Sequence, residues 1–147
     1  MSANPQVGDS GPYTFRMATL AENLLLLLVR VIVGVAFIAG SRTALKDVPA
    51  FAQRNNVPMP IAWFTGIAEL LGAIGILLGL WVFLPALGLM ALMLGAGSMK
   101  VFVWKTGYWA NKNGWEYDLM LFTFCAVLVK WGAGDFSIDG IIDAVRD

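Results

Sequence analysis

The sequence predicts an all-α integral membrane protein, in which four transmembrane helices form an antiparallel bundle followed by a short amphipathic C-terminal segment. Hydrophobic residues make up 59 % of the chain and charged residues 14 %, whereas soluble domains average about 45–50 % and about 25 %. The 147 residues are enough for one domain. A soluble domain of this size has too little interior to bury so much apolar surface, which favours a lipid environment.

The first two spans are predicted from hydropathy and proline placement. A transmembrane helix needs about 20 mostly apolar residues to cross roughly 30 Å of hydrocarbon. Such runs extend from about Leu20 to Ala39 and from about Ile61 to Leu80. The second run begins after Pro58 and Pro60, and proline suits a first helical turn because the N–H groups there have no helical partner. Residues 42–58 form a polar link between the two.

The third and fourth spans complete the predicted bundle over residues 20–134. The third begins at Trp81 or Val82 and ends near Val101, and a shorter fourth extends from Tyr117 to about Ala133. Few residues separate the second and third spans, so these two should form an antiparallel hairpin. Because backbone groups in lipid must pair within a helix or a closed barrel, four spans alternating in direction are expected.

The two ends of the chain are not predicted to cross the membrane. Residues 1–19 form an N-terminal arm, expected to be mobile or interfacial. Residues 135–147 form a tail in which four apolar residues recur at helical spacing: Ile138, Ile141, Ile142 and Val145. This pattern predicts a short amphipathic helix on the membrane surface or on a partner.

Basic residues predict the orientation. The first and third links share one side and carry six basic residues: Arg42, Lys46, Arg54, Lys100, Lys105 and Lys112. The other side carries three: Arg16, Lys130 and Arg146. Cytoplasmic loops carry the excess of Lys and Arg, so both links are expected in the cytoplasm and both termini outside.

The composition also excludes several kinds of functional site. Histidine is absent, Cys125 is the single cysteine, and ten basic residues balance ten acidic ones. No intrachain disulfide, dithiol pair, histidine-ligated haem or zinc, or histidine acid–base catalyst is therefore expected. The balanced charge gives no field for nucleic acid. Cys125, in the middle of the fourth span, is expected to be a small apolar filler.

Two charged residues lie inside the predicted spans. An ionisable group deep in a span costs about 2.5–3.5 kcal/mol on insertion scales and usually has a partner. Arg30 and Glu69 both fall roughly 12–14 Å below the same surface when the rise is 1.5 Å per residue. We therefore expect a buried Arg30–Glu69 ion pair. It is either a structural clamp between the first two helices or the border of a polar pocket for a quinone headgroup or a proton.

A second polar cluster is predicted near the third link. It combines charged residues with tryptophans: Lys100, Glu116, Asp118, Trp104 and Trp115. One interpretation is an aromatic belt with a snorkelling lysine at the membrane interface. The other is the mouth of a cleft between helices, with Lys100 and Glu116 at its opening.

Glycine spacing predicts close helix packing in the second span. Gly72, Gly75 and Gly79 include a small-xxx-small pattern, which lets a neighbouring helix approach closely. The neighbour is either another helix of the same chain or a second subunit. The pattern predicts packing and carries no chemistry.

Five motifs in order resemble the DoxX family of small bacterial membrane proteins, from about Leu25 to Asp139. They are Arg30-x3-Gly34-x2-Phe37-x2-Gly40, Val57-Pro58-Met59-Pro60, Glu69-x2-Gly72, Gly114-x-Glu116-Tyr117 and the ending Gly132-Ala133-Gly134-Asp135-Phe136-Ser137-Ile138-Asp139. The chain departs from the family at three places. A lysine common after the first-span glycine is displaced, the usual arginine between spans two and three is missing from residues 80–83, and Asp135 stands where a basic residue is frequent. These departures bear on a shared anion-binding role, and not on the fold.

The resemblance implies a four-helix membrane bundle linked to redox systems, as a subunit of a thiosulfate:quinone oxidoreductase or of an oxidative-stress complex. We therefore predict a non-catalytic subunit without independent enzymatic activity. It would bind no cofactor by itself except a possible quinone, and its partners would be the lipid bilayer and a redox-protein subunit or further copies of itself.

Two other functions remain open. One is a small proton-coupled transporter with Glu69 as the carrier carboxylate, against which an arginine at the same depth argues. The other is a purely structural assembly factor, in which Arg30 and Glu69 only lock the bundle.

Overall fold

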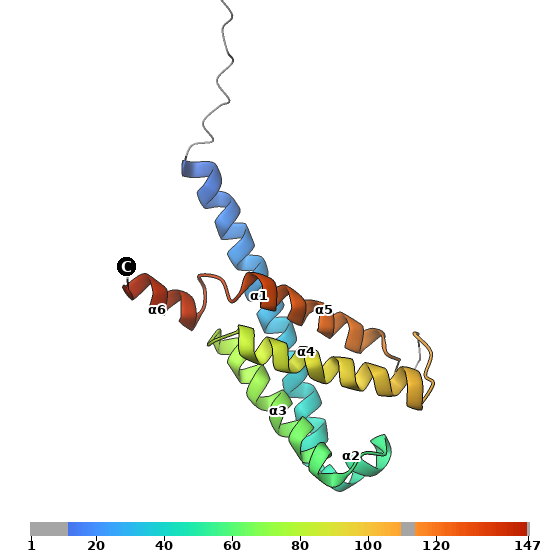
Figure 1. The fold of residues 1–147 in the computed structure, drawn as a ribbon. Helices are drawn as coiled ribbons and strands as arrows, with labels where there is room; N and C mark the ends of the chain where they lie inside the picture. The colour runs from blue at the N-terminus through green and yellow to red at the C-terminus, as the bar shows by residue number, and fades with distance from the viewer. Residues whose placement is uncertain (1–11, 110–113, 147) are drawn as a thin grey trace, which may run out of the picture.

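The computed structural model describes residues 12–109 and 114–146. Within these ranges the chain is helical and contains no strand, which confirms the predicted all-α class. In chain order the elements are α1 (Pro12–Lys46), α2 (Val48–Asn55), α3 (Met59–Leu78), α4 (Phe83–Ser98), the π-helical turn η1 (Met99–Val103), α5 (Glu116–Trp131) and α6 (Ile138–Arg146) (Figure 1).

Three helical segments are long and apolar enough to cross a membrane. They are Leu20–Lys46, Met59–Leu78 and Phe83–Val103. Large apolar side chains cover the outside of the fold, and Phe64, Leu71 and Phe102 are each at least 65 % exposed. The predicted bundle of four spans is not confirmed, because α5 has only 16 residues. At 1.5 Å per residue its length is about 24 Å, short of the roughly 30 Å of a hydrocarbon core.

The first helix is longer at both ends than predicted. Residues 12–19 of the predicted arm belong to α1, whereas residues 1–11 lie outside the described residues. At the other end α1 continues past Ala39 to Lys46. There the hydroxyl groups of Ser41 and Thr43 donate hydrogen bonds to carbonyl groups within the same helix. Because both hydroxyl groups are satisfied within α1, the helix continues to Lys46 although these polar residues lower its hydropathy.

The first link contains a helix that was not predicted. Asp47 ends α1 and caps α2, since its carboxylate accepts a hydrogen bond of 3.0 Å from the Ala50 backbone N–H. Asn56 ends α2 in the left-handed conformation, with φ of 50°. The chain then turns through Pro58 into α3, so α2 forms an elbow beside the ends of α1 and α3 (Figure 1).

Helices α1 and α3 pack antiparallel through glycines. A side chain at Gly34 would collide with Leu77, one at Gly40 would lie 3.2 Å from the Glu69 carboxylate, and one at Gly66 would collide with Leu45. These contacts fix how far each helix extends past the other. Along this register Glu69 lies level with Gly40, and Arg30 lies level with the C-terminal end of α3.

Helices α4 and α5 form a second pair, which crosses α1 and α3 obliquely (Figure 1). The predicted α3–α4 hairpin is present, with a side chain at Gly72 excluded by Leu89 and one at Gly75 restricted by Pro85. These glycines therefore pack against a helix of the same chain. The core between the two helix pairs contains residues from all four helices: Val33, Phe37, Ile76, Leu89, Leu121, Cys125 and Leu128.

The tail forms the predicted short helix at its end. Ser137 caps α6, because its hydroxyl oxygen accepts a hydrogen bond of 2.9 Å from the Gly140 N–H. The Asp139 N–H donates to the Gly79 carbonyl at 3.1 Å, which holds the start of α6 at the α3–α4 turn. Ile141 and Val145 remain 62 % and 81 % exposed.

Candidate functional site

Arg30 does not pair with Glu69, and this part of the sequence prediction is wrong. The guanidinium group is 2 % exposed, and it donates four hydrogen bonds to backbone carbonyl oxygens. Two of them belong to the last turn of α3, Ile76 at 2.9 Å and Leu77 at 2.7 Å. The other two belong to the segment after α5, Ala133 at 3.2 Å and Phe136 at 2.7 Å.

The error has a simple geometric cause. The predicted depth of Arg30 was counted from a helix end at Ala39, whereas α1 continues to Lys46. Seven further residues displace Arg30 along the helix by about 10 Å. Arg30 therefore meets the carbonyl groups at the C-terminus of α3, where the negative end of the helix dipole favours a cation.

Arg30 is the centre of a structural cluster at one end of the bundle. Gly79 caps α3 with φ of 68°, and a side chain there would collide with Ser137 and come within 2.5 Å of the guanidinium. Nearby, the Asn23 side chain on α1 exchanges two hydrogen bonds with Asp135, at 2.6 and 3.0 Å. The cluster thus joins α1, the end of α3 and the segment that leads to α6.

A cavity of about 560 Å³ lies toward the opposite end of the bundle, between the two helix pairs. Its polar lining includes Glu69, Lys100, Asp118, Tyr117, Thr65 and Asn55. Its apolar lining includes Phe37, Phe51, Trp104, Met93 and Leu121. Apolar walls with a few converging polar groups are typical of small-molecule sites of this size.

Glu69 faces this cavity from α3. The residue is half-buried, and its carboxylate lies against Gly40, which has no side chain to cover it. It forms no salt bridge with another described residue. The carboxylate is therefore accessible from the cavity.

Lys100 and Asp118 form the other charged part of the lining. Their Nζ and Oδ2 atoms are 2.7 Å apart, and both side chains are about nine-tenths buried. The Lys100 ammonium also lies 3.4 Å from the Gly114 carbonyl oxygen. The π-helical turn η1 places Lys100 here, and such turns occur frequently at functional sites.

The structure separates the members of the predicted cleft mouth. Lys100, Asp118 and Trp104 line the cavity together with Glu69, so one member of the predicted ion pair and three members of the predicted cleft mouth share one site. Trp115 instead lines a smaller hollow of about 290 Å³ between α4 and α5, which Ser98 and Asp118 also line. Glu116 lines neither hollow, and its Oε2 atom is buried beside Gly114 without a hydrogen-bond partner among the described residues.

Sequence reasoning missed the contributions of α2 and Tyr117. Phe51 and Asn55 reach the cavity because α2 folds under α1 and α3. Asp47 followed by Pro49 is a helix-start signal that would have predicted α2. Tyr117 was predicted only as the first residue of the fourth span, because the sequence does not show which side of that helix faces the cavity.

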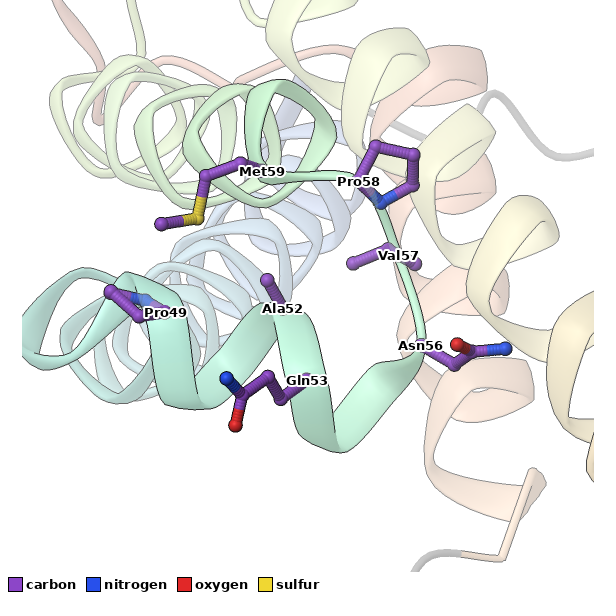
Figure 2. Close-up of a pocket in the computed structure, with 7 residues that line it drawn as sticks. All are labelled: Pro49, Ala52, Gln53, Asn56, Val57, Pro58 and Met59. Atoms are coloured by element: carbon purple, nitrogen blue, oxygen red, sulfur yellow. The ribbon is translucent and has the colours of Figure 1, made fainter.

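A separate hollow lies at the turn between α2 and α3. Figure 2 shows its lining around the α2–α3 turn, with Pro49, Gln53 and Met59 among the labelled side chains. Its lining has no charged side chain. It offers no group for proton or ion chemistry, in contrast to the cavity.

The fold and the cavity together define a helical integral membrane protein with a polar site enclosed by apolar helices. A family model described as DoxX matches residues 25–105, more than half of the chain, and the protein belongs to this family. The match covers the second and third long apolar segments and the first from residue 25 onward, and it confirms the predicted resemblance to the DoxX family. No curated protein and no solved structure matches the chain.

Proposed function

We propose that this DoxX-family protein is the membrane subunit of a quinone-linked redox complex, and that its cavity binds the quinone headgroup. The single observation that carries the proposal is the meeting of Glu69, Lys100, Asp118 and Tyr117 in one cavity with apolar walls. The chain itself would be non-catalytic, and a redox-protein subunit would supply the electrons.

The lining suits both oxidation states of the headgroup. A quinone carbonyl oxygen accepts hydrogen bonds, which the Lys100 ammonium and the Tyr117 hydroxyl are able to donate. A quinol hydroxyl donates, and the Glu69 carboxylate on α3 is able to accept this hydrogen bond. Aromatic residues Phe37, Phe51 and Trp104 provide faces for the ring.

Substitution of Glu69 tests the binding site. Glu69→Gln keeps the shape of the side chain and removes its charge, so a charge-assisted hydrogen bond of about 1.5–3 kcal/mol becomes a neutral one of about 0.5–1.5 kcal/mol. Quinol affinity is therefore expected to fall about tenfold. Affinity for the oxidised quinone should change less than about threefold. Calorimetric titration of the full chain in nanodiscs, with a tailless benzoquinone and its quinol, measures both values.

Glu22→Gln is the matched control, because Glu22 is an exposed carboxylate on α1 outside the cavity lining. It should leave both affinities unchanged. Absence of saturable binding by the native chain would contradict the quinone site and favour a purely structural assembly factor.

The subunit role needs its own experiment. After gentle detergent extraction from the native membrane, affinity purification and mass spectrometry should recover a stoichiometric redox protein. Recovery of a lone homo-oligomer would contradict the proposal.

A proton-coupled transporter is the second candidate, and one observation favours it. The Arg30 guanidinium donates to carbonyl groups at the end of α3 and after α5 and does not contact Glu69. The expected objection to a transporter, an arginine paired with the titrating carboxylate, therefore does not apply. In proteoliposomes, a pH gradient would then drive solute uptake by the native chain, and Glu69→Gln would abolish it. The quinone subunit predicts no such uptake.

We further propose that α5 is the fourth span, with the first and third links in the cytoplasm of a bacterial inner membrane. Arg30 and the Asp139 N–H connect the segment after α5 to the end of α3. This end lies opposite the third link, so α5 must return the chain across the bundle. A tilt or local bilayer thinning accommodates a span of this length.

A further inference from the structure

A further hollow, distinct from those described above, borders the cavity and is lined by residues of α3 and α4. We call this hollow of about 540 Å³ the α3–α4 groove. Its lining comes from both helices and includes Phe64, Leu71, Gly88, Ala91 and Leu92. Every lining residue is apolar or glycine, in contrast to the charged lining of the cavity.

The groove and the cavity share part of one wall. Ala91 and Leu92 line both hollows. One turn before this wall, a side chain at Gly88 would meet no atom within 4 Å, and the same holds for Gly95 on the cavity side. The two glycines thus leave open space on either side of Ala91 and Leu92, the residues at which the groove and the cavity meet.

We infer that the groove holds the apolar tail of the ligand whose headgroup occupies the cavity. The ligand class is then an amphiphile with a hydrogen-bonding ring and a long flexible prenyl or alkyl chain, which crosses at Ala91 and Leu92. This inference rests on the proposed quinone site and adds the path of the tail.

The groove would contribute to affinity through its packing and its position next to the cavity, and only slightly through hydrophobic transfer. Lipid tails are as apolar as leucine, so transfer of a prenyl chain from lipid to the groove gains little hydrophobic energy. The gain comes from close packing against Phe64 and Leu71 and from the tether that keeps the ring at the cavity. A modest effect on affinity is therefore expected.

The test compares two ring probes on the full chain in nanodiscs. One is the tailless benzoquinone, and the other carries a decyl chain on the same ring. Gly88→Phe places a ring in the groove, where open space accommodates it. The control Leu84→Phe adds an aromatic ring at an exposed α4 position outside the groove lining.

Gly88→Phe is expected to weaken binding of the tailed probe about fivefold, while binding of the tailless probe stays unchanged. Leu84→Phe should alter neither. Unchanged binding of both probes by Gly88→Phe would overturn the inference and leave the groove to ordinary membrane lipid. Failure of both probes to bind the native chain would instead overturn the proposed function.

A second measurement needs no variant. A photoreactive diazirine at the end of the decyl chain should label residues of α3 and α4 around the groove, with Phe64 and Leu71 among them. Labelling spread evenly over exposed leucines of α1, such as Leu25 and Leu28, would overturn the assigned path.

Discussion

Arg30 shows how a charge inside a membrane helix is satisfied without an opposite charge. Its four hydrogen bonds reach carbonyl groups of two segments that lie 46 to 106 residues away in the sequence. The Ile76 carbonyl also accepts from the Gly79 N–H. For the other three carbonyl groups, the guanidinium supplies the donor that a carbonyl group needs in lipid. The Arg30 side chain therefore stabilises the C-terminal end of α3. The sequence indicated that Arg30 is a buried charge but did not indicate its hydrogen-bond partners.

Substitutions at Arg30 and Glu69 should be energetically independent. Arg30→Met leaves buried carbonyl groups without donors and is expected to lower the free energy of unfolding by about 3 kcal/mol or more. Arg30→Lys, which keeps the charge, should retain part of this stability. A double-mutant cycle with Glu69→Gln, measured by denaturation in mixed micelles, should give a coupling energy within about 0.5 kcal/mol of zero. A coupling above about 1 kcal/mol would contradict the separation of the two residues.

The Lys100–Asp118 pair should behave in the opposite way. Lys100→Met leaves the Asp118 carboxylate buried and alone, at a cost of about 3–5 kcal/mol. The double variant Lys100→Met with Asp118→Asn removes both charges and should recover most of that stability. Lys105→Met is the control, because Lys105 is exposed. Equal instability of the single and double variants would show that the pair contributes through packing instead.

At the scale of the elements, two local features decide which residues reach the cavity. The elbow formed by α2 brings Phe51 and Asn55 under the bundle, and the π-helical turn η1 turns Lys100 inward. A helix-start signal at Asp47 made the first feature predictable. The sequence carried no such signal for the π-helical turn, and its widened hydrogen bonds, such as that from the Trp104 N–H to the Met99 carbonyl at 2.9 Å, are seen only in the structure.

The number of crossings gives a prediction at this scale. Single cysteines replace three exposed residues, Gln53 on α2, Trp81 at the α3–α4 turn and Val145 on α6. In intact cells a membrane-impermeant maleimide should label the cysteines at 81 and 145 and label the one at 53 only after permeabilisation. The native chain serves as the unlabelled control, since Cys125 is fully buried.

Labelling of positions 53 and 145 from the same side would contradict four crossings. Labelling of 53 alone in intact cells would keep four crossings and reverse the proposed orientation. The two proposals are thus tested separately by one set of variants.

For the molecule as a whole, the two polar regions have different roles at opposite ends. The Arg30 cluster joins three segments by hydrogen bonds, whereas Glu69 and the Lys100–Asp118 pair face an open cavity. One hydrogen-bonded end and one end with an accessible cavity are consistent with the proposed subunit, which would hold a small amphiphile for a partner. Sequence reasoning placed Arg30 and Glu69 together and therefore merged these two roles.

The sequence by itself determined the helical class, the membrane environment, the DoxX family and the α3–α4 hairpin. These follow from local hydropathy, from the backbone's need for internal hydrogen bonds and from short motifs. Only the tertiary structure decided that Glu69 shares a cavity with Lys100 and Asp118, while Arg30 binds the end of α3. The reason is register: hydropathy does not mark where a helix ends, and the seven residues from Gly40 to Lys46 move a side chain by about 10 Å. Contacts such as Gly34 with Leu77 set that register, and they exist only once the helices have packed.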